Sequence, residues 1–347
     1  MIFCRLLFCA ISLVAALAGD VPVTTDNFVR AETHRMMQAY VDKGAFGGFT
    51  HIRLPTPLDE QNVIRMNRDT LYSAGIFDLS TPLTIEMPNS GNRFMSLLVI
   101  NEDHHTPVDV QYGNGTVTLT EEKAGSRYVF VIIRTFVDPS SPQDLEEVHK
   151  LQDAVTVTQA AKGSWEVPQW NQEQLKDIRD AALSIAKYVP DFGSGFGKKG
   201  EVNPVTHFLV TAFGWGGNPK EDATYVSITP PKDDGKTAYT LTLENVPVDG
   251  FWSVTVYNKD GFLEENEHDS YNVNNVTAQK GEDGRVVIHF GGDPTKSNFI
   301  PITEGWNAVL RLYRPRAEVL DGSWTAPELV EVSADSKRRR RLSLVLP

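Results

Sequence analysis

The stretch KTAYTLTLENVPVDGFWSVTVYN, residues 236–258, contains two β-strand patterns separated by a turn. The apolar positions are Tyr239, Leu241 and Leu243 in the first pattern and Trp252, Val254 and Val256 in the second. Alternation with a period of two places the three apolar side chains of the first pattern on one face and those of the second pattern on another. Short strands with turn residues between them favour a sandwich or jelly-roll over a parallel sheet.

Similar short runs, rich in Val, Ile, Leu, Thr and Tyr, extend in both directions from this stretch. The predicted strands are 62–67, 71–78, 83–88, 93–101, 106–112, 115–120 and 128–136, then 223–229, 237–244, 251–258, 285–291 and 307–314. Helical spacing of apolar residues predicts a helix near 26–43, one from Pro142, one from Asn171 and one after Asn203-Pro204. Gln174 lies three residues after Asn171, which is a capping-box spacing.

These patterns predict an α+β chain that is mainly β, with two sandwich-like or jelly-roll-like domains and a helical insert between them. The predicted division is a signal peptide at 1–18, an N-terminal β-rich domain at 19–141, a mainly helical connection at 142–222, a C-terminal β-sandwich-like domain at 223–324 and a basic tail at 325–347.

The first eighteen residues have the pattern of a secretory signal peptide. Arg5 precedes an uncharged apolar run, and Ala16 and Ala18 form a small-residue cleavage site before Gly19. A membrane anchor is the rival interpretation, but the uncharged run is too short to cross a bilayer as a helix. Secretion to the extracellular space is therefore expected, with no membrane span in the mature chain.

Cys4 and Cys9 are the two cysteines of the sequence, and both lie in the leader. The mature chain is therefore expected to have no disulfide and no thiolate chemistry. Asn114-Gly-Thr and Asn275-Val-Thr are glycosylation acceptor patterns, which agree with export.

The chain is acidic, with 33 basic and 45 acidic residues. Without Arg5 and the five basic residues Lys337 to Arg341, 27 basic residues remain against 45 acidic ones, a net charge of −18. A body of that sign repels phosphate backbones, so nucleic acid is not an expected partner. The basic block itself is interpreted as a solvated tail or as a processing-protease site.

The densest polar cluster is Asn101-Glu102-Asp103-His104-His105, at the end of an apolar strand. Asp103, His104 and His105 are candidate ligands of a divalent metal. Alternatively, His104 or His105 is a general base that a carboxylate orients. The structural alternative is a polar strand end with a hydrogen-bonded histidine.

Two further clusters follow predicted strands. In Asn67-Arg68-Asp69-Thr70, Arg68 can hold a carboxylate and Asp69 can orient a base, or all four can form a turn. Tyr257 ends a strand in turn-forming residues. Gly195-Phe-Gly-Lys-Lys-Gly200 matches G-x-G-x-x-G, but it follows a helix instead of a strand and is interpreted as an interhelical loop.

Four strings together resemble a known family pair. Asn62–Tyr72 and Val99–His104 resemble the domain of unknown function numbered 1254, and Asn245–Asn258 with Leu312–Arg316 resembles the one numbered 1214. The resemblance covers about Val23 to Trp324. It implies two β-rich domains joined by helices and no particular reaction, so it assigns no catalytic residue.

Two classes of function remain open. The first is a secreted hydrolase or lyase-like enzyme, with catalytic residues His104, Asp103, Asp69, Arg68 and Tyr257 converging on a cleft between the domains. The second is a non-catalytic extracellular binding or structural module. A small-molecule or polymeric extracellular ligand is the expected partner, and a homo-oligomer is a further candidate assembly.

Overall fold

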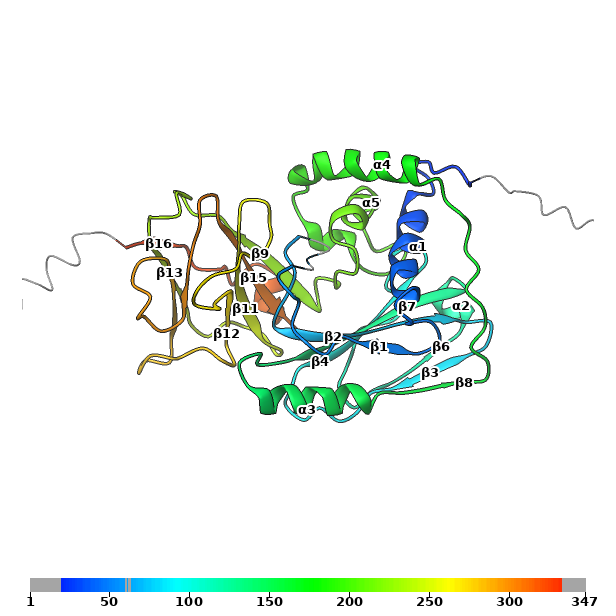
Figure 1. The fold of residues 1–347 in the computed structure, drawn as a ribbon, viewed down its shortest axis with the longest axis horizontal. Helices are drawn as coiled ribbons and strands as arrows, with labels where there is room; N and C mark the ends of the chain where they lie inside the picture. The colour runs from blue at the N-terminus through cyan, green and yellow to red at the C-terminus, as the bar shows by residue number, and fades with distance from the viewer. Residues whose placement is uncertain (1–19, 60, 62–63, 333–347) are drawn as a thin grey trace, which may run out of the picture.

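The computed structural model describes residues 20–59, 61 and 64–332. The predicted signal peptide, both cysteines and the basic block Lys337 to Arg341 lie outside these residues. In Figure 1 the N-terminal β-rich part lies on the right and the C-terminal part on the left.

A five-stranded sheet forms the centre of the N-terminal part, in the order β1-β2-β7-β4-β5. Its strands are β1 (Phe49–His51), β2 (Thr70–Asp78), β7 (Tyr128–Phe136), β4 (Met95–Asn101) and β5 (Gln111–Tyr112). Every residue of β4 and β7 is buried. These strands therefore read as continuous apolar runs, because both faces of the sheet are covered.

A three-stranded sheet covers one of those faces, in the order β6-β3-β8. Its strands are β3 (Leu83–Glu86), β6 (Thr116–Leu119) and β8 (Thr156–Gln159), with helix α2 (Glu121–Ala124) after β6. Leu83, Ile85 and Val117 pack against Leu97 and Val131 of the larger sheet. This part is therefore a sandwich, as the strand alternation predicts.

Helices cover the other face (Figure 1). They are α1 (Phe28–Val41), α4 (Gln172–Ile185) and α5 (Pro204–Phe213), with 3₁₀ helices η1 (Ala186–Tyr188) and η2 (Phe192–Gly195) between α4 and α5. Met37 of α1 packs on Ile76, Leu98 and Phe130. Helix α3 (Pro142–Asp153) instead buries Val148 against Leu71 and Val137. The helices of residues 142–222 therefore pack against the N-terminal part, α3 on a sheet and α4 on helices α1 and α5.

Helix caps follow the sequence signals. Asn171 accepts a hydrogen bond from the Gln174 backbone, and Asn203 accepts two at the start of α5. The side chain of Gln174 does not return to Asn171, as in a full capping box, but accepts from Val23 N at 2.9 Å. The predicted helix starts are thus confirmed, and the second half of the capping box is replaced by a contact with the N-terminal segment.

The C-terminal part is a sandwich of two four-stranded sheets, ordered β14-β13-β10-β16 and β12-β11-β15-β9. The strands are β9 (Ala223–Ile228), β10 (Tyr239–Leu243), β11 (Trp252–Tyr257), β12 (Asn272–Asn274), β13 (Val286–Phe290), β14 (Phe299–Ile300), β15 (Asn307–Tyr313) and β16 (Val330–Glu331), and the short helix α6 (Ala317–Leu320) precedes β16. Leu241 and Ile288 of one sheet meet Val254 and Leu310 of the other. The predicted fold class, α+β and mainly β, is confirmed.

Two strand predictions are wrong. Within 62–67, the described residues 64–67 form no strand: Arg65 has a positive φ of 57°, and its N–H donates to Gly261 O in the C-terminal part at 2.8 Å. Within 106–112 only Gln111–Tyr112 is a strand, because Thr106 N donates to Gly197 O. The prediction of a mainly helical segment also missed β8, which pairs with β3.

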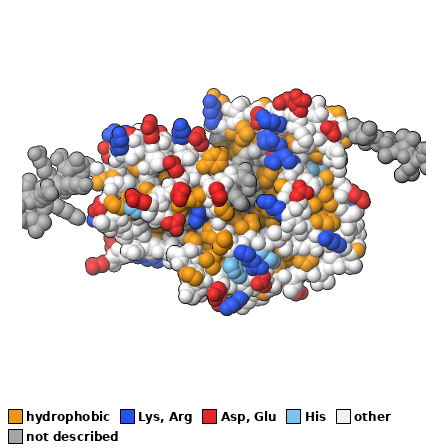
Figure 2. Space-filling model, in the orientation of Figure 1, with side chains coloured by type: hydrophobic (Ala, Val, Ile, Leu, Met, Phe, Trp, Pro, Cys, Tyr) orange, Lys and Arg blue, Asp and Glu red, His pale blue; other side chains and the backbone are white. Residues whose placement is uncertain are grey.

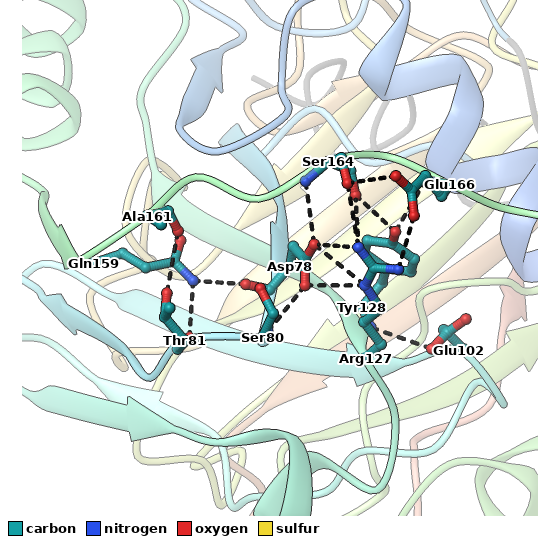
Figure 3. Close-up of polar contacts among 10 residues, drawn as sticks. All are labelled: Asp78, Ser80, Thr81, Glu102, Arg127, Tyr128, Gln159, Ala161, Ser164 and Glu166. Atoms are coloured by element: carbon teal, nitrogen blue, oxygen red, sulfur yellow. Dashed lines mark hydrogen bonds and ion pairs between the residues drawn. The ribbon is translucent and has the colours of Figure 1, made fainter.

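A polar cluster holds the segment after β8 against the central sheet (Figure 3). Asp78, at the end of β2, accepts hydrogen bonds from Arg127 Nη2 at 2.8 Å and from Ser164 N at 3.2 Å. Burial alone would raise the pKa of Asp78, but hydrogen bonds from Arg127, Ser80 and Ser164 outweigh it and lower the pKa to about 2. Tyr128 adds a bond from its hydroxyl to Ser164 O at 2.7 Å.

We predict that Asp78→Asn lowers the free energy of unfolding by about 2 kcal/mol at neutral pH. The lowered pKa means that the ionised form stabilises the fold above pH 4, and that this contribution is lost as the pH falls toward 2. Urea titrations of parent and variant between pH 2 and 7 should therefore converge in acid. Asp180→Asn, at an exposed pair with Lys176, is the control. A difference that stays constant over this range would contradict the assignment.

Candidate functional site

The cluster Asn101–His105 forms the turn that follows β4. Asn101 Oδ1 accepts from the backbone N–H groups of Asp103 and His105, each at 3.0 Å, and its amide donates to Ala124 O. His104 has a positive φ of 61°, so its side chain leaves the strand direction. As a result, the four side chains that follow Asn101 do not share one face.

Glu102 and Asp103 hold helix α1. Trp170 Nε1 donates to His34 Nδ1 at 3.1 Å, so His34 Nε2 carries the proton and donates to Glu102 Oε1 at 2.7 Å. Burial would raise the pKa of Glu102, but bonds from His34 and the Tyr128 backbone lower it. The two carboxylate oxygens of Asp103 accept hydrogen bonds from Arg30, Oδ1 from Nε at 2.8 Å and Oδ2 from Nη2 at 2.6 Å.

Both ring nitrogens of His104 are used inside the protein. Gly216 N donates to Nε2 at 2.9 Å, so Nδ1 carries the proton and donates to Thr211 Oγ1 at 2.9 Å. The ring stacks on Trp215, with ring centres 5.5 Å apart. Burial, with His207 and His105 close by, holds the pKa of His104 well below its usual value. His104 therefore lies here as a neutral, buried and fully hydrogen-bonded histidine.

His105 and His207 stack, with ring centres 4.3 Å apart and planes within 5°. The ring nitrogens of His207 lie 2.8 Å from Gly195 O and 2.9 Å from Asp103 O, and both carbonyls are bonded only when both nitrogens carry protons. Burial and His207 lower the pKa of His105 to about 4, and its Nδ1 has no partner among the described residues.

The three candidate metal ligands are engaged separately by contacts within the protein. Asp103 accepts from Arg30. His104 bonds Thr211 and Gly216, and His105 stacks on His207. In the described part of the chain, no group of three or more His, Cys, Asp or Glu side chains is arranged to hold an ion. Strand β4 ends at Asn101, so the side chains that follow do not alternate as in a strand, and φ is positive at His104.

The second predicted cluster lies where the two β-rich parts meet. Asp69 is fully buried, and its Oδ1 accepts from Asn272 Nδ2 at 2.5 Å and Asn274 Nδ2 at 3.0 Å, both on β12. Burial raises the pKa of Asp69, while the hydrogen bonds from Asn274 and Asn272 and the charge of Arg311 oppose the rise. Asn67 Nδ2 donates to Tyr313 OH at 2.6 Å.

Arg311 is the centre of this interface, and sequence reasoning missed it. Its guanidinium is buried and donates to Thr255 Oγ1 at 3.0 Å, Tyr257 OH at 2.6 Å and Arg65 O at 2.7 Å. The Tyr257 hydroxyl donates onward to Met66 O at 2.8 Å. The available signal was the charge itself, at an alternate position between Leu310 and Leu312 of an apolar strand.

Arg68 is half-buried and makes contacts within the protein. It donates to Thr56 O at 3.1 Å and lies over the Tyr271 ring at 4.8 Å. The predicted catalytic residues therefore fall into two groups, Arg68, Asp69 and Tyr257 at the interface and Asp103 and His104 beneath the helices. Among the described residues the two groups share no hydrogen-bond partner, so the contacts give no sign of the predicted common cleft.

The two glycosylation patterns differ in accessibility. Asn114 is exposed between β5 and β6, with a φ of 52°. Asn275 is half-buried, and its Oδ1 accepts from Trp252 N at 2.8 Å. The amide group of Asn114 is thus the more open of the two.

A groove of about 410 Å³ lies beside the histidine stack. Three segments line it, residues 106–110, 193–201 and 219–222. The second segment contains the G-x-G-x-x-G match, which is a loop between η2 and α5 as expected, and Gly197 O fixes it to Thr106 N at 2.9 Å. Sequence reasoning did not identify this groove, because its walls are far apart in the chain.

The side chains that line the groove include more acidic than basic groups. Asp109, Glu201, Glu221 and Asp222 are acidic, and Lys198 and Lys220 are basic. Tyr112 OH donates to Asp222 Oδ1 at 2.6 Å, and Lys198 pairs with Asp109 at 2.7 Å. Burial raises the pKa of Asp222, and the charges of Glu221 and Asp109 add to the rise, while the Tyr112 hydrogen bond and the charge of Arg314 oppose it. Acidic side chains therefore outnumber basic ones among the residues that line the groove.

Comparisons with known proteins agree with the two-part architecture. Residues 46–121 match the family described as "Protein of unknown function (DUF1254)", and residues 229–317 match "Protein of unknown function (DUF1214)". The two matches lie along the chain in the order that the resemblance predicts. No curated protein matches it.

One solved structure shares the fold of this chain, and a second is similar over most of its length. The VPA0106 protein of Vibrio parahaemolyticus is 16% identical, with a TM-score of 0.64 over 89% of this chain and 98% of that one. A putative uncharacterized protein from Burkholderia cenocepacia is 14% identical, with a TM-score of 0.49 over 90% of this chain and 89% of that one. The first likeness shows the fold alone.

The surface and helices of the chain add two facts. In Figure 2 acidic and basic side chains are intermixed across the face in view, with apolar side chains exposed between them. Among residues 20–59, 61 and 64–332, no helix has both the length and the apolar character that a bilayer crossing needs.

We predict that His104→Ala lowers the free energy of unfolding by about 1–3 kcal/mol, because it leaves Gly216 N and Thr211 Oγ1 without their partner. Urea denaturation followed by circular dichroism measures the loss. His105→Ala is the matched control and should cost less, because His105 is only half-buried. Equal losses in the two variants would contradict the structural role given to His104.

We also predict that Arg311→Met costs at least about 3 kcal/mol, since it leaves three buried acceptors and Asp69 without their cation. Combined with Asp69→Asn, the loss should fall short of the sum of the single losses by about 1 kcal/mol. Arg316→Met, at an exposed pair with Asp249, is the control and should change little. Strict additivity would show that Asp69 and Arg311 do not interact.

Proposed function

We propose that this protein is a secreted, non-catalytic binding module that takes its ligand in the groove between residues 106–110, 193–201 and 219–222. The observation that carries the proposal is the groove itself. Its volume of about 410 Å³ lies within the range of roughly 300–1,000 Å³ that small-ligand sites occupy. By contrast, the residues expected to be catalytic make contacts within the protein.

The lining indicates what the ligand carries. Val108, Phe196 and Pro219 offer apolar surface, and Asp222 offers a carboxylate that the Tyr112 hydroxyl orients. Such a site, with an apolar wall and a few oriented polar groups, is typical of small-molecule recognition. Because acidic side chains outnumber basic ones around it, we propose a ligand that joins a positive group to an apolar part.

A hydrolase or lyase-like enzyme is the second candidate, and His105 favours it. His105 directly precedes Thr106 of the groove wall, and its Nδ1 lacks a partner among the described residues. A general base works best with a pKa near the operating pH. With a pKa of about 4, His105 is neutral but a weak base at pH 7. The binding role is therefore preferred.

Secretion rests on the sequence of the leader, which lies outside the described residues. The functional experiment therefore begins with protein collected from the medium of a eukaryotic secreting host. Edman sequencing of that material should start at Gly19. A chain that stays in the cells and begins at Met1 would contradict export.

We predict that this material binds 2-phenylethylammonium more tightly than its neutral and anionic analogues, 2-phenylethanol and 3-phenylpropionate. Amide signals of Val108 and Lys220 in NMR titrations report occupancy of the groove. Asp222→Asn should weaken ammonium binding about tenfold, which is 1.4 kcal/mol, and leave 2-phenylethanol unchanged. Asp180→Asn on α4 is the control for a general loss of negative charge.

The two candidates separate cleanly in this experiment. No response of the groove signals to any of the three probes would contradict the binding role. Turnover of an ester or glycoside substrate that His105→Gln abolishes, with probe binding retained, would instead establish the enzyme.

A further inference from the structure

The groove and the C-terminal tail have complementary chemistry. The groove combines four acidic side chains, two lysines and apolar surface from Val108, Val110 and Phe196. The tail combines five consecutive basic residues, Lys337 to Arg341, with the apolar residues Leu342, Leu344, Val345 and Leu346. We propose that the segment Arg341–Leu346 docks in the groove of its own chain. This inference rests on the proposed function, since it makes the tail the first occupant of the same site.

Charge favours this docking over a free tail. Without the leader and the five basic residues of the tail, the chain has a net charge of −18, so the body attracts its own tail. Negative charge at the groove is concentrated enough that Glu221 and Asp109 act on Asp222. An arginine can bind the Asp222 carboxylate with two parallel hydrogen bonds, while the leucines that follow cover Val108 and Phe196.

The chain length allows the tail to reach the groove. Val332, the last described residue, donates its N–H to Ala238 O at 2.8 Å. The next residue, Tyr239, packs on Trp306. Two residues after Trp306, Ala308 pairs with Ile228, the last residue of β9. Asp222 immediately precedes β9, whose six residues span about 20 Å, and the two sheets lie about 10 Å apart.

The tail must therefore cover a path of roughly 30 Å. Arg341 lies nine positions after Val332, and nine steps of about 3.3 Å span roughly 30 Å in an extended chain. Arg341 and the leucines that follow it can thus enter the groove, while Lys337 and Arg338 remain on the approach. A docked tail would compete with any other ligand of the groove.

A spin label on the tail tests the docking. Since the chain without its leader has no cysteine, Leu344→Cys gives a single position for a nitroxide in the otherwise complete mature protein. We expect selective broadening of the amide signals of Val108, Lys220 and Glu221, and its loss in high salt. The matched control has the same label and serine at positions 338 to 341, and its groove signals should stay sharp.

The same samples separate this inference from the proposed function. The control with four serines should bind 2-phenylethylammonium more tightly than the parent, because its tail no longer competes. Unbroadened groove signals in the parent, together with probe binding in the groove, would overturn the docking alone. Unbroadened signals and no probe binding would overturn both. Broadening that appears only between separately labelled and isotope-enriched copies would overturn docking within one chain.

Discussion

The buried guanidinium of Arg311 is the constraint on which the arrangement of the two domains depends. It can be stable away from water only if its donors are bonded, and its partners come from both parts: Thr255 and Tyr257 from the C-terminal sheet, and Arg65 O from the N-terminal segment. Asp69 supplies the opposite charge from the start of β2. Separation of the domains would take Arg65 O and the charge of Asp69 away from this buried cation, so the two parts hold together at this point.

Three of the four strings that carry the family resemblance also contribute to this interface, and the fourth, Val99–His104, lies beneath the helices. Asn67 bonds Tyr313, Tyr257 bonds Met66 O, and Arg65 N bonds Gly261 O. Each contact joins the region of one domain match to the region of the other. The resemblance is therefore carried in large part by residues that fit the two domains together, and the search for chemistry at Arg68, Asp69 and Tyr257 found the joint instead.

Regular patterns were predictable because they are local. The period-two alternation of 236–258 gives β10 and β11, and Asn171 and Asn203 cap the helices that they predict. The polar sites were not predictable, because the residues that contact one another there are far apart in the sequence. His104 is 107 residues from Thr211, and the walls of the groove come from three separate segments. A histidine beside a carboxylate looks the same in sequence whether its partner is a substrate or a helix.

The histidine cluster nevertheless has a bearing on function through position. His207 lies between Asp103 O, at the turn after β4, and Gly195 O, at the wall of the groove. Because His105 stacks on the same ring and leads into Thr106, the three histidines connect the end of the central sheet to two of the three groove walls. Buried, hydrogen-bonded rings of this kind give a rigid support to a binding surface. The cluster Asn101–His105 thus supports two walls of the groove through contacts within the protein.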